Sequence, residues 1–165
     1  MIRVMMMSCA LLFAGCACLP QHPEPVKSQA VAPVLIRTEV VGYELRDVRQ
    51  ALFEAIEAQG LKVGTVLPFG QMLERGREAA GVTQTVYRHA EIVQFCSAQV
   101  AWQLVLENPD FIARCPLAVA IYQLDSQPDR VVLVYRSPGD DVAGAKSAGW
   151  LLQKIVQDVQ HTLRP

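Results

Sequence analysis

The sequence has little excess charge of either sign and no long apolar run. Fifteen Lys and Arg residues face sixteen Asp and Glu residues, so the net charge of the 165 residues is -1. Nucleic-acid binding needs a clustered excess of Lys and Arg, and an acidic disordered chain would not contain 52% hydrophobic residues. No uninterrupted apolar segment reaches the roughly 18–20 residues that span a membrane. The composition therefore excludes a nucleic-acid partner and suits one globular domain.

Familiar catalytic motifs are also missing. The chain has three histidines and shows no Ser-His-Asp pattern, no Gly-x-Ser-x-Gly turn, no phosphate-binding loop and no dinucleotide-binding glycine pattern. Five cysteines are present, but none has the Cys-x-x-Cys spacing of thioredoxin-type oxidoreductases. These absences favour a non-catalytic protein and leave an enzymatic role open.

The N-terminus has the pattern of an export signal. Arg3 precedes about a dozen mostly apolar residues, a length typical of a secretory signal. The run ends in Phe13-Ala14-Gly15-Cys16, which resembles a bacterial lipobox. We expect residues 1–15 to be a lipoprotein signal peptide and Cys16 to carry a covalent lipid, the one cofactor-like group expected. The alternative is an ordinary secretory signal that is cut nearby.

A proline-rich segment follows the expected lipidation site. Residues 16–34 contain four prolines and no aromatic residue, a composition that favours an extended tether. At about 3.1 Å per residue, the tether would hold a domain up to ~50 Å from the membrane. Ala17 follows the anchor where Asp would retain a lipoprotein in the inner membrane, so the expected location is the outer membrane, facing the periplasm. Cys18 has no assigned role.

Residues 35–165 predict a single α+β domain. Helices are expected over 45–59, 69–80, 97–107 and 151–163, and strands over 36–43, 61–67, 86–95, 117–124 and 131–135. Residues 125–129 predict a hairpin loop, which makes the last two strands antiparallel. The order implies a mostly antiparallel sheet of about five strands with helices packed on one face. Trp102 and Trp150 are expected to cover the core from their helices.

Four segments resemble a known family in their order and spacing. They are Gly60-Leu61-Lys62-Val63, Ile92-Val93-Gln94-Phe95-Cys96-Ser97-Ala98, Cys115-Pro116-Leu117-Ala118-Val119 and Val134-Tyr135-Arg136-Ser137-Pro138. Together they resemble the family of domain-of-unknown-function 302 over residues 36–163. The resemblance implies an antiparallel sheet with helices on one face. It implies no activity, because none is established for the family. Cys96 stands where that family usually has Gly, and Cys115 stands just before the family's Pro.

Cys96 and Cys115 are the candidate chemical site. Export would place them in an oxidising compartment, where disulfides persist. If their strands were parallel neighbours, the two residues would lie about 16 Å apart; the antiparallel arrangement implied by the resemblance brings them to the same edge. A structural disulfide, a redox or metal-binding (copper or zinc) pair, and two unpaired thiols all remain open. His89 and Met72 are the additional candidate metal ligands, and a plain surface residue is the simpler interpretation of His89.

These observations predict a lipid-anchored periplasmic protein that binds a small ligand or an envelope protein without catalysis. A Cys96–Cys115 disulfide would support its fold. The competing hypothesis is a thiol-redox or metal-handling protein that uses the same two cysteines. A third hypothesis is a structural envelope protein without a pocket.

Overall fold

The computed structural model describes residues 34–164. The expected signal peptide, the lipidation site Cys16, Cys18 and residues 17–33 of the tether lie outside the described residues. The strands are β1 (Leu35–Val41), β2 (Val63–Leu67), β3 (Tyr87–Phe95), β4 (Leu117–Leu124) and β5 (Gln127–Arg136). The helices are α1 (Leu45–Ala58), α2 (Phe69–Gly76), α3 (Ala98–Glu107), the 3-10 helix η1 (Pro109–Arg114) and α4 (Ala143–Thr162).

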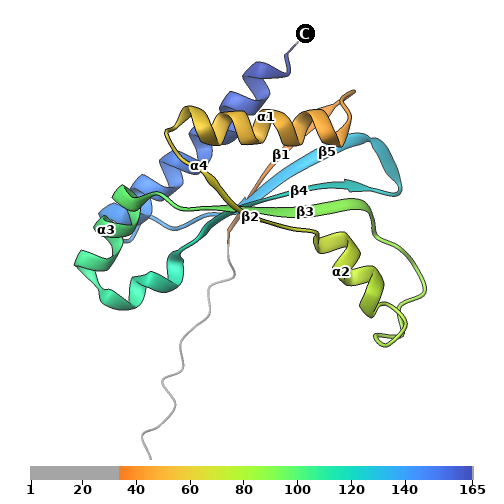
Figure 1. Ribbon diagram of the computed structural model, residues 1–165, viewed down its shortest axis with the longest axis horizontal. Helices are drawn as coiled ribbons and strands as arrows, with labels where there is room; N and C mark the ends of the chain where they lie inside the picture. The colour runs from red at the N-terminus through yellow and green to blue at the C-terminus, as the bar shows by residue number, and fades with distance from the viewer. Residues whose placement is uncertain (1–33, 165) are drawn as a thin grey trace, which may run out of the picture. The chain divides into compact units, whose positions relative to one another are not determined.

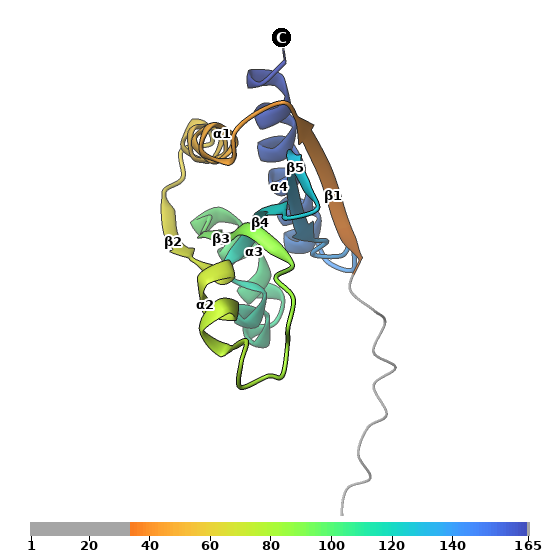
Figure 2. The same ribbon diagram turned by 90° about the vertical axis from the view of Figure 1, so that its right-hand side faces the viewer.

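The five strands form one antiparallel sheet in the order β1-β5-β4-β3-β2 (Figure 1). Figure 2 shows β1 and β2 at opposite edges of this sheet. Helices α1 and α4 pack against each other and cover one face, whereas α2 lies against β3 from the other face, where Gly70 approaches Ala90. The α+β class and the antiparallel sheet expected from the sequence are confirmed.

The core lies between the sheet and the two long helices. Alternate residues of the central strands point into it, and apolar residues at helical spacing meet them. The fully buried members include Val93, Phe95, Val119, Ile121, Val131 and Leu133 from the sheet, with Val48, Leu52, Ile56, Leu152, Ile155 and Val159 from α1 and α4. Among residues 34–164, no helix combines the length and the apolar character that crossing a bilayer requires.

Local sequence signals set the ends of two helices. Gly60 follows the last turn of α1 with a φ of +73°, and its N–H donates to the carbonyl of Glu57 at 2.8 Å. Glycine adopts this left-handed conformation without steric cost, so the chain reverses there into β2. Ser97 precedes α3, and its Oγ accepts a hydrogen bond from the N–H of Val100 at 3.3 Å. The cap starts α3 directly at the end of β3.

The β4–β5 hairpin is tighter than the sequence predicted. The loop is Asp125-Ser126 rather than residues 125–129, and β5 already begins at Gln127. Two contacts explain the longer strand. The side chain of Gln123 donates to the carbonyl of Pro128, and the N–H of Gly42 donates to the carbonyl of Asp129. Because β1 ends opposite Arg130, Pro128 lies at a free edge, where its missing N–H is tolerated.

The expectation that both tryptophans cover the core was wrong. Trp102 is 64% exposed and Trp150 is 63% exposed. Helix α3 turns Val100 and Leu104 toward the core, and Trp102, two residues from each, stands about 200° around the helix from both. Helical spacing alone predicted a helix but not which of its faces is buried.

Gly144, at the start of α4, lies directly against α3. A Cβ added there would meet the Leu104 side chain and the Leu104 backbone nitrogen, each at 2.8 Å. Rotation of the leucine cannot relieve the backbone clash. We therefore expect Gly144→Ala to lower the free energy of unfolding by about 1–3 kcal/mol in urea titrations, the usual cost of overpacking.

Gly149→Ala is the matched control in the same helix. The nearest atom to its added Cβ is 3.9 Å away, in Pro138. Alanine has the higher helix propensity, so this variant should be neutral or up to about 1 kcal/mol more stable. Equal losses for the two variants would contradict the close α3–α4 packing.

Candidate functional site

Cys96 and Cys115 lie at the same end of the sheet. Strands β3 and β4 are antiparallel, and Phe95 pairs with Leu117. Cys96 comes directly after Phe95, and Cys115 stands two residues before Leu117, so the antiparallel arrangement expected for these strands is observed. Both thiols are free in this structure, with Cys96 exposed and Cys115 half-buried.

The environment of Cys115 suits a structural role better than a reactive one. Burial, and to a smaller extent the electrostatic interaction with Cys96, raise the pKa of the Cys115 thiol. A raised pKa keeps the group protonated near neutral pH, and the thiol is a poorer nucleophile and metal ligand than the thiolate. Cys115 is therefore a poor candidate for a reactive thiol.

The other candidate metal ligands are not near the cysteines. His89 is exposed on β3, seven residues before Cys96, which separates the two by about 20 Å along the strand. Met72 is exposed on α2 and lines a separate cavity of about 340 Å³ with Leu73 and Val86. Within the described part of the chain, no three His, Cys, Asp or Glu residues are grouped as a metal site. The residues named for metal binding thus do not form one site.

A groove lies near Cys96, between the end of α1 and the first turns of α3 and α4. Its volume is about 530 Å³. We call it the amide groove, because three glutamine side chains line it. Its residues are Gln59, Leu61, Ser97, Gln99, Val100, Gln103, Lys146, Ser147, Trp150 and Leu151.

The amide groove adjoins an open depression of about 720 Å³ along the edge of β2. The two hollows share Gln59, Leu61, Ser97 and Gln99. The depression adds further polar groups and brings Cys96 into the lining. Its remaining residues are Gly60, Lys62, Gly64, Thr65, Gln94, Phe95, Cys96, Ala98 and Pro116. The cysteine site and the groove are therefore parts of one surface region.

Two amides in the groove have unused hydrogen-bonding capacity. The Nε2 of Gln59 donates to Asp158 Oδ2 at 3.2 Å, which leaves its Oε1 as an acceptor. The Oε1 of Gln103 is shielded from solvent and has no hydrogen-bond partner among the described residues. A buried oxygen without a partner costs about 1–3 kcal/mol.

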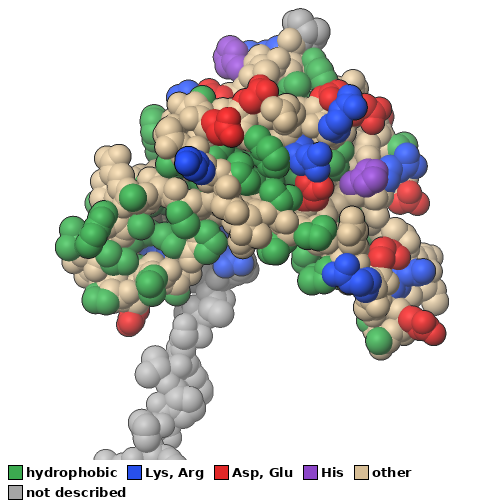
Figure 3. Space-filling view, viewed as in Figure 1, with side chains coloured by type: hydrophobic (Ala, Val, Ile, Leu, Met, Phe, Trp, Pro, Cys, Tyr) green, Lys and Arg blue, Asp and Glu red, His purple; other side chains and the backbone are tan. Residues whose placement is uncertain are grey.

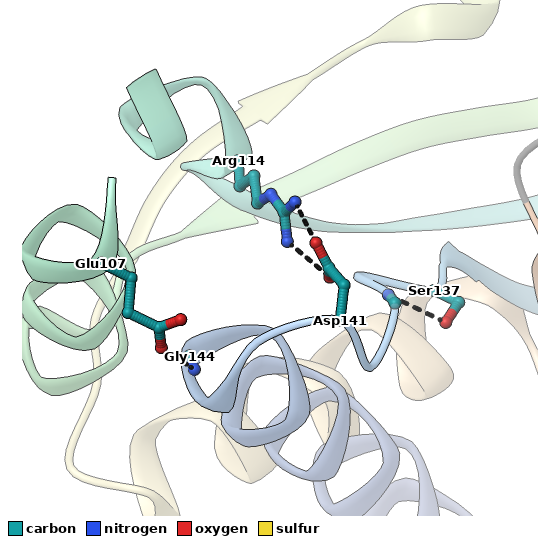
Figure 4. A network of polar contacts seen from close by, with 6 residues as sticks. Glu107, Arg114, Ser137, Asp141 and Gly144 are labelled. Atoms are coloured by element: carbon teal, nitrogen blue, oxygen red, sulfur yellow. Dashed lines mark hydrogen bonds and ion pairs between the residues drawn. The ribbon is translucent and has the colours of Figure 1, made fainter. Parts of the chain in front are cut away.

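A polar network holds the groove walls in place (Figure 4). Arg114 of η1 makes a two-pronged ion pair with Asp141, with nitrogen–oxygen distances of 2.9 and 2.7 Å, and its guanidinium stacks 3.9 Å over the Phe111 ring. Glu107, at the end of α3, accepts a hydrogen bond from the N–H of Gly144 at 3.4 Å. These contacts tie α3 and η1 to the loop that leads into α4.

Arg114 holds the pKa of the Asp141 carboxyl below its ordinary value, first by hydrogen bonding and also by its charge. A carboxyl whose pKa falls on folding adds stability above its unfolded pKa, and the contribution is lost as the pH falls through its folded pKa. We expect Asp141→Asn to melt at a lower temperature than the native protein near neutral pH, with the difference shrinking below about pH 4.

Asp140→Asn is the control, because Asp140 is an exposed neighbour outside the Arg114 pair. Its melting temperature should match that of the native protein over the same pH range. A shift for Asp141→Asn that does not change with pH would contradict the ion-pair explanation.

No sequence motif pointed to the amide groove. The available signal was local: Gln99 and Gln103 are four residues apart, on one face of a helix that is otherwise apolar up to Glu107. The remaining lining comes from the chain after α1, from the start of α3 and from α4, and only the packing of the helices brings these segments together.

Comparisons with known proteins agree with the observed architecture. A family model described as "Domain of unknown function DUF302" matches residues 37–165. A solved structure, the uncharacterized conserved protein DUF302 from Bacillus stearothermophilus, superposes with a TM-score of 0.59 at 15% identity, over 76% of this chain and 95% of that one. At this identity the likeness concerns the fold alone. No curated protein matches the chain.

Proposed function

The chain belongs to the DUF302 family, and from its groove we propose that it binds a short saccharide without transforming it, as a lipid-anchored protein of the periplasm. The family description names no activity, so the proposal rests on this chain's own residues. The observation that carries it is the set of three glutamine and two serine side chains that line one groove.

The groove lining matches the chemistry of a sugar. Sugar hydroxyls both donate and accept hydrogen bonds, as do the amides of Gln59, Gln99 and Gln103 and the hydroxyls of Ser97 and Ser147. The exposed ring of Trp150 offers a flat apolar surface for the C–H face of a pyranose. Lys62 and Lys146 add positive charge. The combination suits a saccharide that also carries a carboxylate.

Binding without hydrolysis follows from the same lining. Glycoside hydrolysis ordinarily needs two carboxyl groups on either side of the scissile bond. Among the described residues that line the amide groove and the adjoining depression, none is Asp or Glu. The N-acetylglucosamine–N-acetylmuramic acid disaccharide of bacterial cell walls has hydroxyls, acetamido groups and a carboxylate, and it is the saccharide that we propose to test.

The proposed location follows from the lipobox-like segment ending at Cys16. A lipid on Cys16 would hold the domain at the outer membrane, where it faces the periplasm and its saccharides. A Cys96–Cys115 disulfide would join the start of α3 to the start of β4 and so secure one wall of the groove. We assign the pair this structural role, with thiol-redox or metal-handling chemistry as the alternative.

The disulfide is tested by alkylation of the exported full chain, with peptide mapping by mass spectrometry. We expect Cys96 and Cys115 to be unmodified before reduction and both modified after it. In the reduced protein, the raised pKa of Cys115 should make it react more slowly than Cys96, with a rate that still climbs above pH 8.5, about the ordinary thiol pKa. Two reactive thiols before reduction would remove the disulfide from the proposal.

Saccharide binding is tested by calorimetric titration with the cell-wall disaccharide. Loss of a buried hydrogen-bond partner costs about 1–3 kcal/mol, so Gln103→Leu should raise the Kd by about 5- to 150-fold. Trp150→Ala should weaken binding through loss of the stacking surface.

Gln157→Leu is the matched control, because Gln157 is exposed on α4 outside the groove, and it should bind as the native protein does. Native-like binding by Gln103→Leu, or no binding by the native protein, would refute the saccharide site.

A further inference from the structure

Helix α3 and η1 expose an apolar surface outside the groove. Trp102 is 64% exposed, Leu106 is 78% exposed and Ile112 is 69% exposed. Trp102 and Leu106 are four residues apart and share one face of α3. Figure 3 shows hydrophobic side chains gathered over α3 and η1, at the lower left of the view. We call Trp102, Leu106 and Ile112 the outer patch.

The outer patch lies at the end of the sheet where the described chain begins. The N–H of Ser137, just after β5, donates to the carbonyl of Val34 at 2.8 Å. The loop that follows Ser137 carries Asp141, which is paired with Arg114 at the end of η1. The tether therefore joins the domain on the side of α3 and η1. Val34 and Leu35, at this junction, are themselves exposed apolar residues.

The charges near the outer patch favour an uncharged apolar partner. Helix α3 has no charged residue before Glu107. The single cation of η1, Arg114, is already paired with Asp141, while Asp110 is exposed. On α3 and η1 themselves, a strongly anionic surface would meet the carboxylates of Glu107 and Asp110 without an unpaired cation to bind it. The acyl boundary of a zwitterionic bilayer suits the patch, and tryptophan is enriched at such boundaries because its ring is apolar and its N–H is polar.

From these observations we propose that the outer patch docks on the phospholipid bilayer to which the chain is anchored. The inference rests on the proposed lipid at Cys16, since the intervening residues 17–33 can extend only about 50 Å at 3.1 Å per residue. A domain held within that distance meets the bilayer repeatedly. The outer patch then gives it a fixed orientation, with α3 and η1 toward the lipid.

The two tryptophans allow a direct test, because the chain has no others. Trp150→Phe leaves Trp102 as the single reporter, and Trp102→Phe leaves Trp150. Each lipidated variant is placed in vesicles of phosphatidylethanolamine and phosphatidylcholine with brominated acyl chains, which quench indole fluorescence on contact. We expect Trp102 to lose most of its emission and Trp150 to keep most of it.

A charge substitution tests the surface itself. In the Trp150→Phe background, Leu106→Glu should restore the emission of Trp102, because a carboxylate disfavours entry into lipid. Leu73→Glu on α2 is the control: it also replaces an exposed leucine, and quenching of Trp102 should persist. Quenching that survives Leu106→Glu would overturn the proposal.

Separate measurements test the lipid on Cys16 and the docking of the outer patch. The intact mass of the exported chain shows whether Cys16 carries lipid. If it does not, a hexahistidine tag in place of residues 1–16, with a nickel-chelating lipid, holds the same tether on the vesicle and the quenching is measured again. Unquenched Trp102 on an anchored chain overturns the docking surface. So does a concentration-dependent dimer that shields Trp102 without lipid, which would assign the patch to a second copy of the chain.

Discussion

The antiparallel pairing of β3 with β4 is the constraint on which the candidate site depends. Phe95 lies opposite Leu117, so the chain leaves β3 and enters β4 at the same end of the sheet. Cys96, the Ser97 cap and the first turn of α3 follow directly from one strand, and Cys115 precedes the other. A slip by one residue would turn Val93 and Phe95 out of the core. Burial of these side chains therefore fixes the position of both cysteines and of one groove wall.

Helix α3 divides its surface among three environments. Val100 and Leu104 face the core, and the close approach of Gly144 to Leu104 sets α4 against this side. Gln99 and Gln103 line the amide groove, while Trp102 and Leu106 face outward. A ten-residue helix with one buried stripe needs no apolar residue on its outer side. The outward Trp and Leu thus lack a role in the fold, which makes them informative about a partner.

Local patterns in the sequence predicted most elements, although α4 begins at Ala143, eight residues before the expected start, and η1 was not expected. Tertiary contacts explain several of the other differences. The periodicity of α1, its terminal Gly60 and the Ser97 cap act within a few residues, so the sequence alone located them. The tight Asp125-Ser126 turn depends on Gln123 reaching Pro128 and on Gly42 of a distant segment. The groove draws on the chain after α1 and on α3 and α4, and the exposure of Trp102 depends on which side of α3 meets α4. The turn, the groove and the exposed face of α3 all depend on contacts between distant segments, which no local sequence pattern predicts.

The cysteine pair and the groove are better treated as one unit than as competing sites. Cys96 lines the depression beside the amide groove, while Cys115 is half-buried and has a raised pKa. A thiol held protonated in that position contributes little chemistry to a ligand. A bond between the two sulfurs would instead restrict the segment that starts α3 and carries Gln99 and Gln103. Restricting a binding surface lowers the entropy lost when a ligand orders it, so a structural disulfide and a binding groove would support each other.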